Sequence, residues 1–167
     1  MSDMHNHPLM FTFRDVITGD GFLAGITLSG RALMVMEDGE HWMYGVRPGA
    51  ISETADSPQA LLLRFRNRYK EVLFDIANEC RTFELFKQEV ERFFHEPDSE
   101  EERRWEDAVN KIRSENLAPP KELSHLPTES PETRPSQITV ERLDGIANKR
   151  FMPTDNVPDT YVAPMAA

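Results

Sequence analysis

The sequence is poor in features on which many enzymes and membrane proteins depend. Only one of its 167 residues is cysteine, which excludes an internal disulfide and a cysteine-rich zinc site. No window approaches the roughly 20 consecutive apolar residues that a membrane-spanning helix needs. The first residues lack the basic-then-apolar order of a secretory signal. We therefore expect a cytoplasmic protein that makes no membrane contact.

Positive charge is also scarce. Lysine and arginine number 19 against 29 aspartate and glutamate residues, which gives a formal net charge of -10. A polyphosphate would be repelled unless the basic residues gathered on one face. The densest basic run, Arg64-x-Arg66-x-Arg68-x-Lys70, does not gather, because alternate residues of a helix diverge by about 200°. We therefore expect no direct contact with nucleic acid and favour a basic protein partner; acidity that serves only solubility is the alternative.

The familiar motifs of catalysis are missing too. The sequence contains no glycine-rich phosphate loop, no Gly-x-Ser-x-Gly, no His-Glu-x-x-His and no Cys-x-x-Cys. His5 and His7 are spaced to reach a metal ion from an extended chain, but no third ligand accompanies them. Cys80 falls on the apolar side of an expected helix, where burial raises the pKa of a thiol and keeps it inert. We therefore predict a protein that is not an enzyme and uses no metal and no cofactor.

What is present begins with strand patterns in the N-terminal third of the chain. Alternating apolar and polar residues, separated by turns at Gly19-Asp20-Gly21 and Asp38-Gly39, predict two consecutive hairpins. The Asp-Gly pair supplies the positive φ angles that a tight hairpin turn requires. The expected strands are 11–16, 22–28, 32–36, 42–46 and a short one at 50–54. They form a meander of four or five antiparallel strands.

A long helix is expected next, capped by Asp56 or Ser57 and ending near Glu79. Residues at helical spacing define its core stripe: Leu62, Phe65, Tyr69, Val72, Leu73, Ile76 and Cys80. Leu63 and Phe74 lie about a quarter-turn from this stripe, so they need a second surface to bury against.

Two further helices are expected after it. The first of them runs from a cap at Thr82 to about Phe94, is the candidate to cover Leu63 and Phe74, and carries Phe83, Phe86, Val90 and Phe93 on one side. The other opens with a capping box from Ser99 to Glu102 and carries Trp105, Ala108, Val109 and Ile112 at helical spacing.

Prolines mark the end of the packed part, because most of the 12 prolines lie after residue 117. Residues 9–113 are predicted to form one α+β domain, a small antiparallel sheet packed against two or three helices. Residues 114–135 have the composition of a Pro-rich linker. Residues 136–167 are predicted to be a mobile, flexible tail with a short helix that orders on a partner.

The passage from Leu33 to Ile51, running into Ala55-Asp56-Ser57-Pro58-Gln59-Ala60, resembles the HicB-like antitoxin family. That family has a strand, an Asp-Gly-type hairpin, a strand, a Pro-and-Gly turn and a short strand, then Gly-Asp-Thr-x-Glu-Ala opening a helix. Asp56 and Ala60 match this last motif, and the resemblance covers about residues 32–80. It implies a small sheet backed by a helix, in a non-catalytic module that covers a small basic ribonuclease. The separate DNA-binding domain that such proteins often carry has no counterpart in the pattern of residues 97–167.

These observations predict a non-enzymatic protein-binding module, antitoxin-like or an accessory subunit, that occupies a basic protein partner. Aromatic side chains contribute much of the binding energy when an interface desolvates them. The predicted contact surface therefore combines Trp42 and Tyr44 on the exposed hairpin with Leu63 and Phe74, unless a homodimer uses the latter two.

Two alternatives stay open. In one, the C-terminal tail folds on the partner through Ile138, Leu143 and Phe151, and the globular part is only a scaffold. In the other, the protein is an enzyme or binds a small ligand in a pocket formed across the sheet by Arg14, Asp15, His41 and Tyr44.

Overall fold

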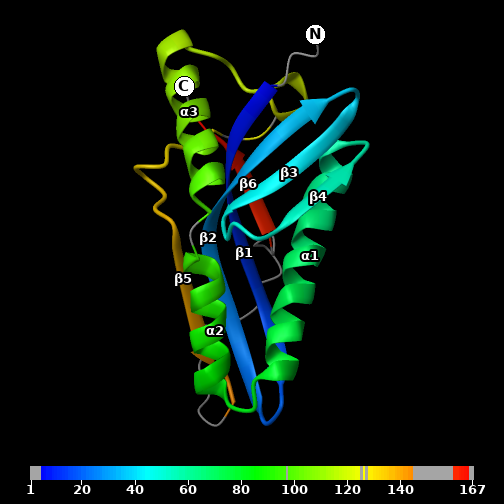
Figure 1. Cartoon of the computed structure of the whole chain (residues 1–167), viewed down its shortest axis with the longest axis vertical. Coiled ribbons are helices and arrows are strands. Elements are labelled where there is room, and N and C mark those ends of the chain that lie inside the picture. Colours follow the sequence, from blue (N-terminus) through cyan, green and yellow to red (C-terminus); the bar gives the residue numbers. More distant parts are fainter. Residues whose placement is uncertain (1–4, 97, 125, 127, 145–159, 166–167) are drawn as a thin grey trace.

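The fold is seen in a computed structural model that describes residues 5–96, 98–124, 126, 128–144 and 160–165. Figure 1 shows a twisted antiparallel sheet with one helix at the right of the view and two helices, one above the other, at the left. The elements are β1 (His5–Gly19), β2 (Phe22–Glu37), β3 (Glu40–Arg47), β4 (Ser52–Ala55), α1 (Pro58–Glu79), α2 (Phe83–His95), α3 (Ser99–Glu115), the 3-10 helix η1 (Lys121–Leu123), β5 (Gln137–Arg142) and β6 (Thr160–Pro164). The predicted α+β class is confirmed.

A long hairpin of β1 and β2 forms the centre of the six-stranded sheet. Its register runs from His5 opposite Met36 to Gly19 opposite Phe22, so the two strands pair over their whole length. The second half of β2 pairs with β3, which pairs with β4, while the first half of β2 pairs with β5. Strand β6 pairs with the edge of β1 that faces away from β2. Every pairing in this sheet is antiparallel.

Both predicted hairpin turns are confirmed. Gly21 has a φ of +76° in the turn between β1 and β2. Asp38 and Gly39 have φ values of 51° and 81° between β2 and β3, as a two-residue turn with positive φ at both positions requires. These turns lie at opposite ends of the long hairpin, the first at the bottom of Figure 1 and the second at its upper right.

Helices α1 and α2 cover one face of the sheet. Ser57 caps α1 by accepting a hydrogen bond from the backbone N–H of Ala60, and Thr82 caps α2 in the same way. The buried side of α1 is Leu61, Phe65, Tyr69, Leu73 and Ala77, and that of α2 is Phe86, Val90 and Phe94. The predicted stripes are therefore rotated slightly: Leu62, Val72, Ile76, Phe83 and Phe93 are only half-buried. The side chains that contact the sheet are spaced four residues apart along each helix, whereas the predicted stripes also contained residues spaced three apart.

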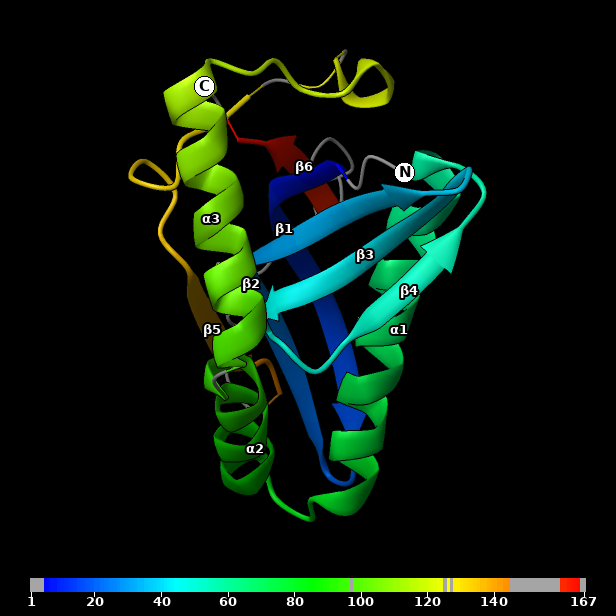
Figure 2. The same cartoon turned by 45° about the horizontal axis from the view of Figure 1, so that its top comes forward.

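Helix α3 packs on the opposite face. Its buried residues are the predicted Trp105, Ala108, Val109 and Ile112. The predicted capping box is wrong by one residue, because Asp98 is the cap and accepts a hydrogen bond from the N–H of Glu101. In Figure 2, strand β3 runs between α3 and α1. The sheet therefore has a separate apolar core on each face.

The predicted helix around Ile138 is wrong. Residues Gln137–Arg142 form β5, an edge strand that pairs with the first half of β2. Ile138 and Val140 are two residues apart and β-branched, which favours a strand over a helix. After β5, the N–H of Leu143 donates a hydrogen bond to the carbonyl of Leu23. The packed sheet thus extends beyond residue 113, while Phe151 lies outside the described residues.

Candidate functional site

The two predicted hairpin aromatics lie together. The rings of Trp42 and Tyr44 are stacked, with centroids 6.1 Å apart and an interplanar angle of 7°. Both side chains are half-buried and pack against the edge of the core beneath α3. The guanidinium of Arg104, from α3, lies 5.4 Å from the Tyr44 ring centroid. The pair is therefore held in place and still partly open to solvent.

Carboxylates surround the end of this hairpin. Glu37, Asp38 and Glu40 are all exposed at the turn between β2 and β3, directly before Trp42 in the chain. No ion pair joins them to a basic side chain in the part of the chain that the structure describes. We refer to Trp42, Tyr44 and these three carboxylates as the hairpin surface.

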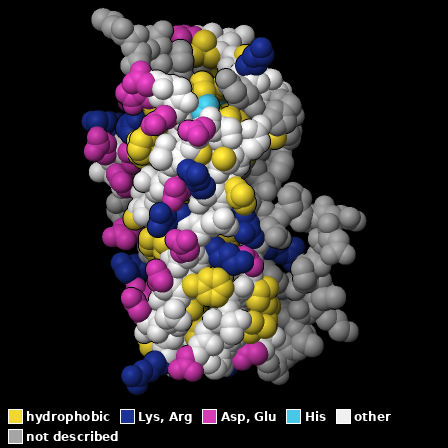
Figure 3. All heavy atoms as spheres, turned by 90° about the vertical axis from the view of Figure 1, so that its right-hand side faces the viewer, with side chains coloured by type: hydrophobic (Ala, Val, Ile, Leu, Met, Phe, Trp, Pro, Cys, Tyr) yellow, Lys and Arg dark blue, Asp and Glu magenta, His cyan; other side chains and the backbone are white. Residues whose placement is uncertain are grey.

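Leu63 and Phe74 lie on the outer face of α1. Their side chains are 60% and 37% exposed, and roughly three helical turns separate them. The prediction that the second helix covers them is wrong, because α2 lays its apolar side on the sheet instead. Figure 3, which faces this side of the molecule, shows basic and acidic side chains mixed with scattered apolar ones.

The basic run of α1 is paired within the protein. Arg66 and Lys70 contact the same carboxylate of Asp15, at 3.1 and 3.0 Å. Arg68 contacts Glu53 at 2.8 Å. This pairing agrees with the interpretation that the run is no nucleic-acid site.

The pocket expected across the sheet does not form. Neighbouring residues of a strand point to opposite faces, so Arg14 and Asp15 are separated by the sheet. Asp15 contacts α1, whereas Tyr44 packs on the α3 side. His41 and Tyr44, three residues apart on β3, also face opposite ways. The predicted pocket is therefore wrong, because the prediction ignored the alternation of side chains along a strand.

Two of the predicted contact residues of the C-terminal tail lie on or next to β5. Ile138 is half-buried against the core beneath α1 and α2, and Leu143 is also half-buried.

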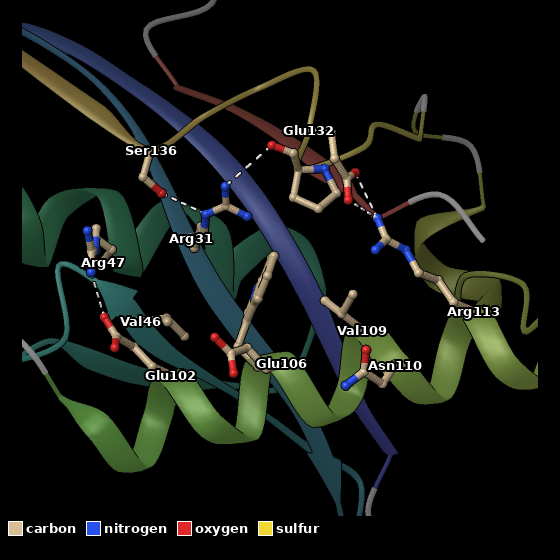
Figure 4. Close-up of a pocket in the computed structure, with 12 residues that line it drawn as sticks. Arg31, Val46, Arg47, Glu102, Glu106, Val109, Asn110, Arg113, Glu132 and Ser136 are labelled. Carbon is tan, nitrogen blue, oxygen red and sulfur yellow. Dashed lines mark hydrogen bonds and ion pairs between the residues drawn. The ribbon is translucent and has the colours of Figure 1, made fainter.

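A groove that the sequence did not predict lies between α3, the position where β3 ends opposite the middle of β2, and residues 131–136. It has a volume of about 610 Å³. Helix α3 lines it with Glu102, Trp105, Glu106, Val109, Asn110 and Arg113, and the strands line it with Arg31, Val46 and Arg47. Figure 4 shows Arg31 between two closed ion pairs, Arg47 with Glu102 and Arg113 with Glu132.

Two arginines face each other across the strands of this groove. Arg31 on β2 is the register partner of Arg47 on β3. Gly30 permits this close pairing, since a Cβ at that position would lie 2.5 Å from the carbonyl oxygen of Arg47. Like charges directly opposite in a sheet destabilise it. Glu102 compensates Arg47 at 2.6 Å, and no carboxylate within the described residues does the same for Arg31.

Arg31 is held by neutral groups. Its Nε donates to Ser136 Oγ at 2.6 Å and its Nη2 to the carbonyl of Pro131 at 3.5 Å. Its guanidinium carbon lies 4.6 Å from the centroid of the Trp105 ring. Burial, and after it the charge of Arg47, lower the pKa of Arg31, although Glu132 partly offsets this. An arginine nonetheless stays charged in proteins, so the groove holds a cation that forms no ion pair within the described residues.

Trp105 also lines the groove, but its indole nitrogen is buried. Trp105 is 7% exposed, and its indole Nε1–H has no acceptor among the described residues. At the far end, hydrogen bonds from Ser130 and Arg113 lower the pKa of Glu132 to about 2. That carboxylate therefore stays ionised and keeps Arg113 occupied, at 2.6 and 2.7 Å.

Sequence reasoning missed Arg31, and one signal could have found it. Ser29-Gly30-Arg31 interrupts an otherwise apolar strand between Leu28 and Ala32. A charged residue in the middle of a central strand is costly to bury, which makes it a candidate for a binding role.

Comparisons with known proteins give no match: no family model, no curated protein and no solved structure is similar to this chain. The HicB-like resemblance therefore stays a prediction. Searching the described residues finds no group of three or more histidine, cysteine or acidic side chains arranged to hold a metal ion. None of the helices in that part of the chain combines the length and apolar character needed to cross a bilayer.

Proposed function

We propose that this protein is a non-enzymatic binding module that contacts a basic protein partner through the hairpin surface. The observation that carries the proposal is the stacked, half-buried pair of Trp42 and Tyr44 beside the exposed carboxylates of the turn. Aromatic anchors surrounded by charged groups are typical of protein interfaces, where the rings supply affinity.

Charge supports a basic partner. The chain carries a net charge of -10, and Glu37, Asp38 and Glu40 project from the hairpin turn. Charges around an interface speed association with a partner of opposite sign and discriminate against partners of like sign. Binding should therefore weaken as ionic strength rises.

The kind of partner follows from the resemblance to HicB-like antitoxins. The resembling passage, about residues 32–80, contains the whole hairpin surface. We therefore propose a cytoplasmic, antitoxin-like protein or accessory subunit whose partner is a small basic protein.

Photo-crosslinking from the hairpin tests the proposal. A photoreactive amino acid replaces Glu40 at the tip between β2 and β3, and a matched variant carries it at Asp20, in the turn at the other end of β2. Both positions are exposed acidic residues at the end of a hairpin, so they differ mainly in their distance from Trp42. In the source cells, the Glu40 variant should capture one protein rich in lysine and arginine, and the Asp20 variant should not.

Two further measurements sharpen the outcome. Adding Trp42→Ser should reduce that capture at least tenfold while the circular dichroism spectrum stays unchanged. Equal capture from both positions, an acidic captured protein, or capture that survives Trp42→Ser would each overturn the proposal.

A further inference from the structure

We infer that the groove beneath α3 binds a small organic carboxylate with an apolar body, and that Arg31 is the residue that recognises its charge. This inference is independent of the proposed function, because the groove and the hairpin surface have no residue in common.

The charge of the groove is the first argument. Two of its three arginines form ion pairs: Arg47 with Glu102 and Arg113 with Glu132, each at 2.6 Å. Arg31 has no such partner within the described residues. An arginine has five N–H donors, and Arg31 uses one on Ser136 and one on Pro131. The remaining donors form part of a planar fork that matches the two oxygens of a carboxylate.

The ring of Trp105 lies beside Arg31. The indole N–H of Trp105 is buried without an acceptor, and the Arg31 guanidinium lies over the same ring at 4.6 Å. A carboxylate bound to Arg31 would supply the missing ion-pair partner and would lie close to the Trp105 ring.

The remaining lining selects among anions. Val46, Val109 and the face of Trp105 form an apolar wall, which suits a hydrocarbon or aromatic body. The volume of about 610 Å³ falls in the range of small-molecule sites, about 300–1,000 Å³. Glu106, exposed at the edge and free of any ion pair in the described residues, adds negative charge that opposes a dianion such as phosphate. A monoanionic carboxylate is therefore favoured over a phosphate.

Nuclear magnetic resonance on the full chain tests the inference, with benzoate as the probe. The sequence has two tryptophans, so ¹⁵N-labelled protein gives two side-chain indole N–H signals, and Trp42→Phe assigns them. Benzoate should shift the Trp105 signal saturably. Acetate, which lacks the apolar body, and inorganic phosphate should each bind at least tenfold more weakly.

Variants of the groove provide the controls. Arg31→Met should weaken benzoate binding at least tenfold. Arg31→Lys should weaken it less, because lysine keeps the positive charge but lacks the planar guanidinium. Arg103→Met removes an exposed arginine of α3 that does not line the groove, so it should change the affinity for benzoate less than twofold. Glu106→Gln should tighten benzoate binding.

Several outcomes would overturn the inference. They are the lack of a saturable shift of the Trp105 signal, phosphate affinity equal to that of benzoate, and equal losses in Arg103→Met and Arg31→Met. The dispersion of the same spectra shows whether each variant is folded. Should Arg31→Met fail to fold, Arg31→Lys decides the matter, since full retention of affinity in it would also be contrary evidence.

Discussion

The two faces of the central sheet are built from the same strands and differ in what they enclose. Beneath α1 and α2 the core is closed and rich in aromatic contacts, such as Phe11 with Phe65 at 5.3 Å and Phe13 with Tyr69 at 4.8 Å. Beneath α3 a smaller core ends in a groove that contains Arg31 and an unpaired indole N–H. One face is a closed aromatic core, and the other combines a smaller core with a groove that contains charged side chains.

Strand alternation produces this difference. Along β2, the even-numbered residues from Ala24 to Met34 are largely apolar and face α1 and α2. The odd-numbered residues include Thr27, Ser29 and Arg31, so the other face cannot become a continuous apolar surface. Helix α3 covers the part of that face where Leu33 and Val35 restore an apolar patch.

The largest expected loss of stability comes from truncating a core side chain on the face of the sheet beneath α1 and α2. Phe65 is 2% exposed and contacts Phe11 edge-to-face. Phe65→Ala should lower the free energy of unfolding by about 4 kcal/mol, because it removes buried apolar area and leaves a cavity. Urea denaturation measures the change.

Leu63→Ala is the matched control on the same helix. Its side chain is 60% exposed, so truncation should change the free energy of unfolding by less than about 0.5 kcal/mol. A large loss in this variant would show that Leu63 is covered in solution, and a small loss in Phe65→Ala would show that the face beneath α1 is not the main core.

Acid should act on the closed face through His7. Burial lowers the pKa of His7 to about 4, against 6.5 in the unfolded chain. Above pH 6.5 both states are neutral and His7 does not affect stability. As the pH falls from 6.5 to 4 the unfolded chain gains the proton first, so stability decreases by about 3 kcal/mol in total and the loss then levels off.

His7→Leu should remove this part of the pH dependence. Chemical denaturation of both proteins between pH 7 and pH 4 gives the difference, in which the contributions of the carboxylates cancel. Parallel curves for the two proteins would mean that His7 is hydrated in the folded state.

A smaller effect of opposite sign is expected at Tyr69. Its side chain is 1% exposed, and its hydroxyl has no hydrogen-bond partner in the described part of the chain. Tyr69→Phe keeps the ring contact with Phe13 and removes an unsatisfied polar group, so it should raise the free energy of unfolding by about 1–2 kcal/mol. A loss of stability in thermal unfolding would instead reveal a partner for the hydroxyl.

The sequence predicted the turns, the helices and most of the caps within residues 5–115, because each of these signals is short-range. It was wrong to divide residues 22–36 into two strands, since Phe22–Glu37 form the single strand β2, and it missed that β1 begins at His5. The Asp38-Gly39 turn, the caps at Ser57 and Thr82, and the spacing of Trp105 to Ile112 all act within a few residues. The class followed from them, since strands followed by amphipathic helices pack as α+β.

The C-terminal strands and the groove could not be predicted in the same way, because they depend on long-range pairing. Ile138 and Val140 find their place beside β2, more than 100 residues earlier in the chain. Arg31 acquires its setting only when Ser136, Trp105 and Arg47 arrive from three other segments. A local sequence pattern cannot predict contacts between segments that are so far apart in the chain.

The smallest effect on stability is expected where the effect on binding should be largest. Arg31→Met loses the hydrogen bond to Ser136 and the contact with the Trp105 ring, which destabilises the fold. It also removes the repulsion from Arg47 and the cost of a half-buried cation without a carboxylate, which stabilises it. These contributions are similar in size, so the free energy of unfolding should stay within about 0.5 kcal/mol of the parent protein.

Benzoate should then raise the melting temperature of the parent and leave that of Arg31→Met unchanged. A loss above about 2 kcal/mol in ligand-free Arg31→Met would instead place Arg31 among the groups that hold the α3 side together, and the contrast between the two faces would disappear.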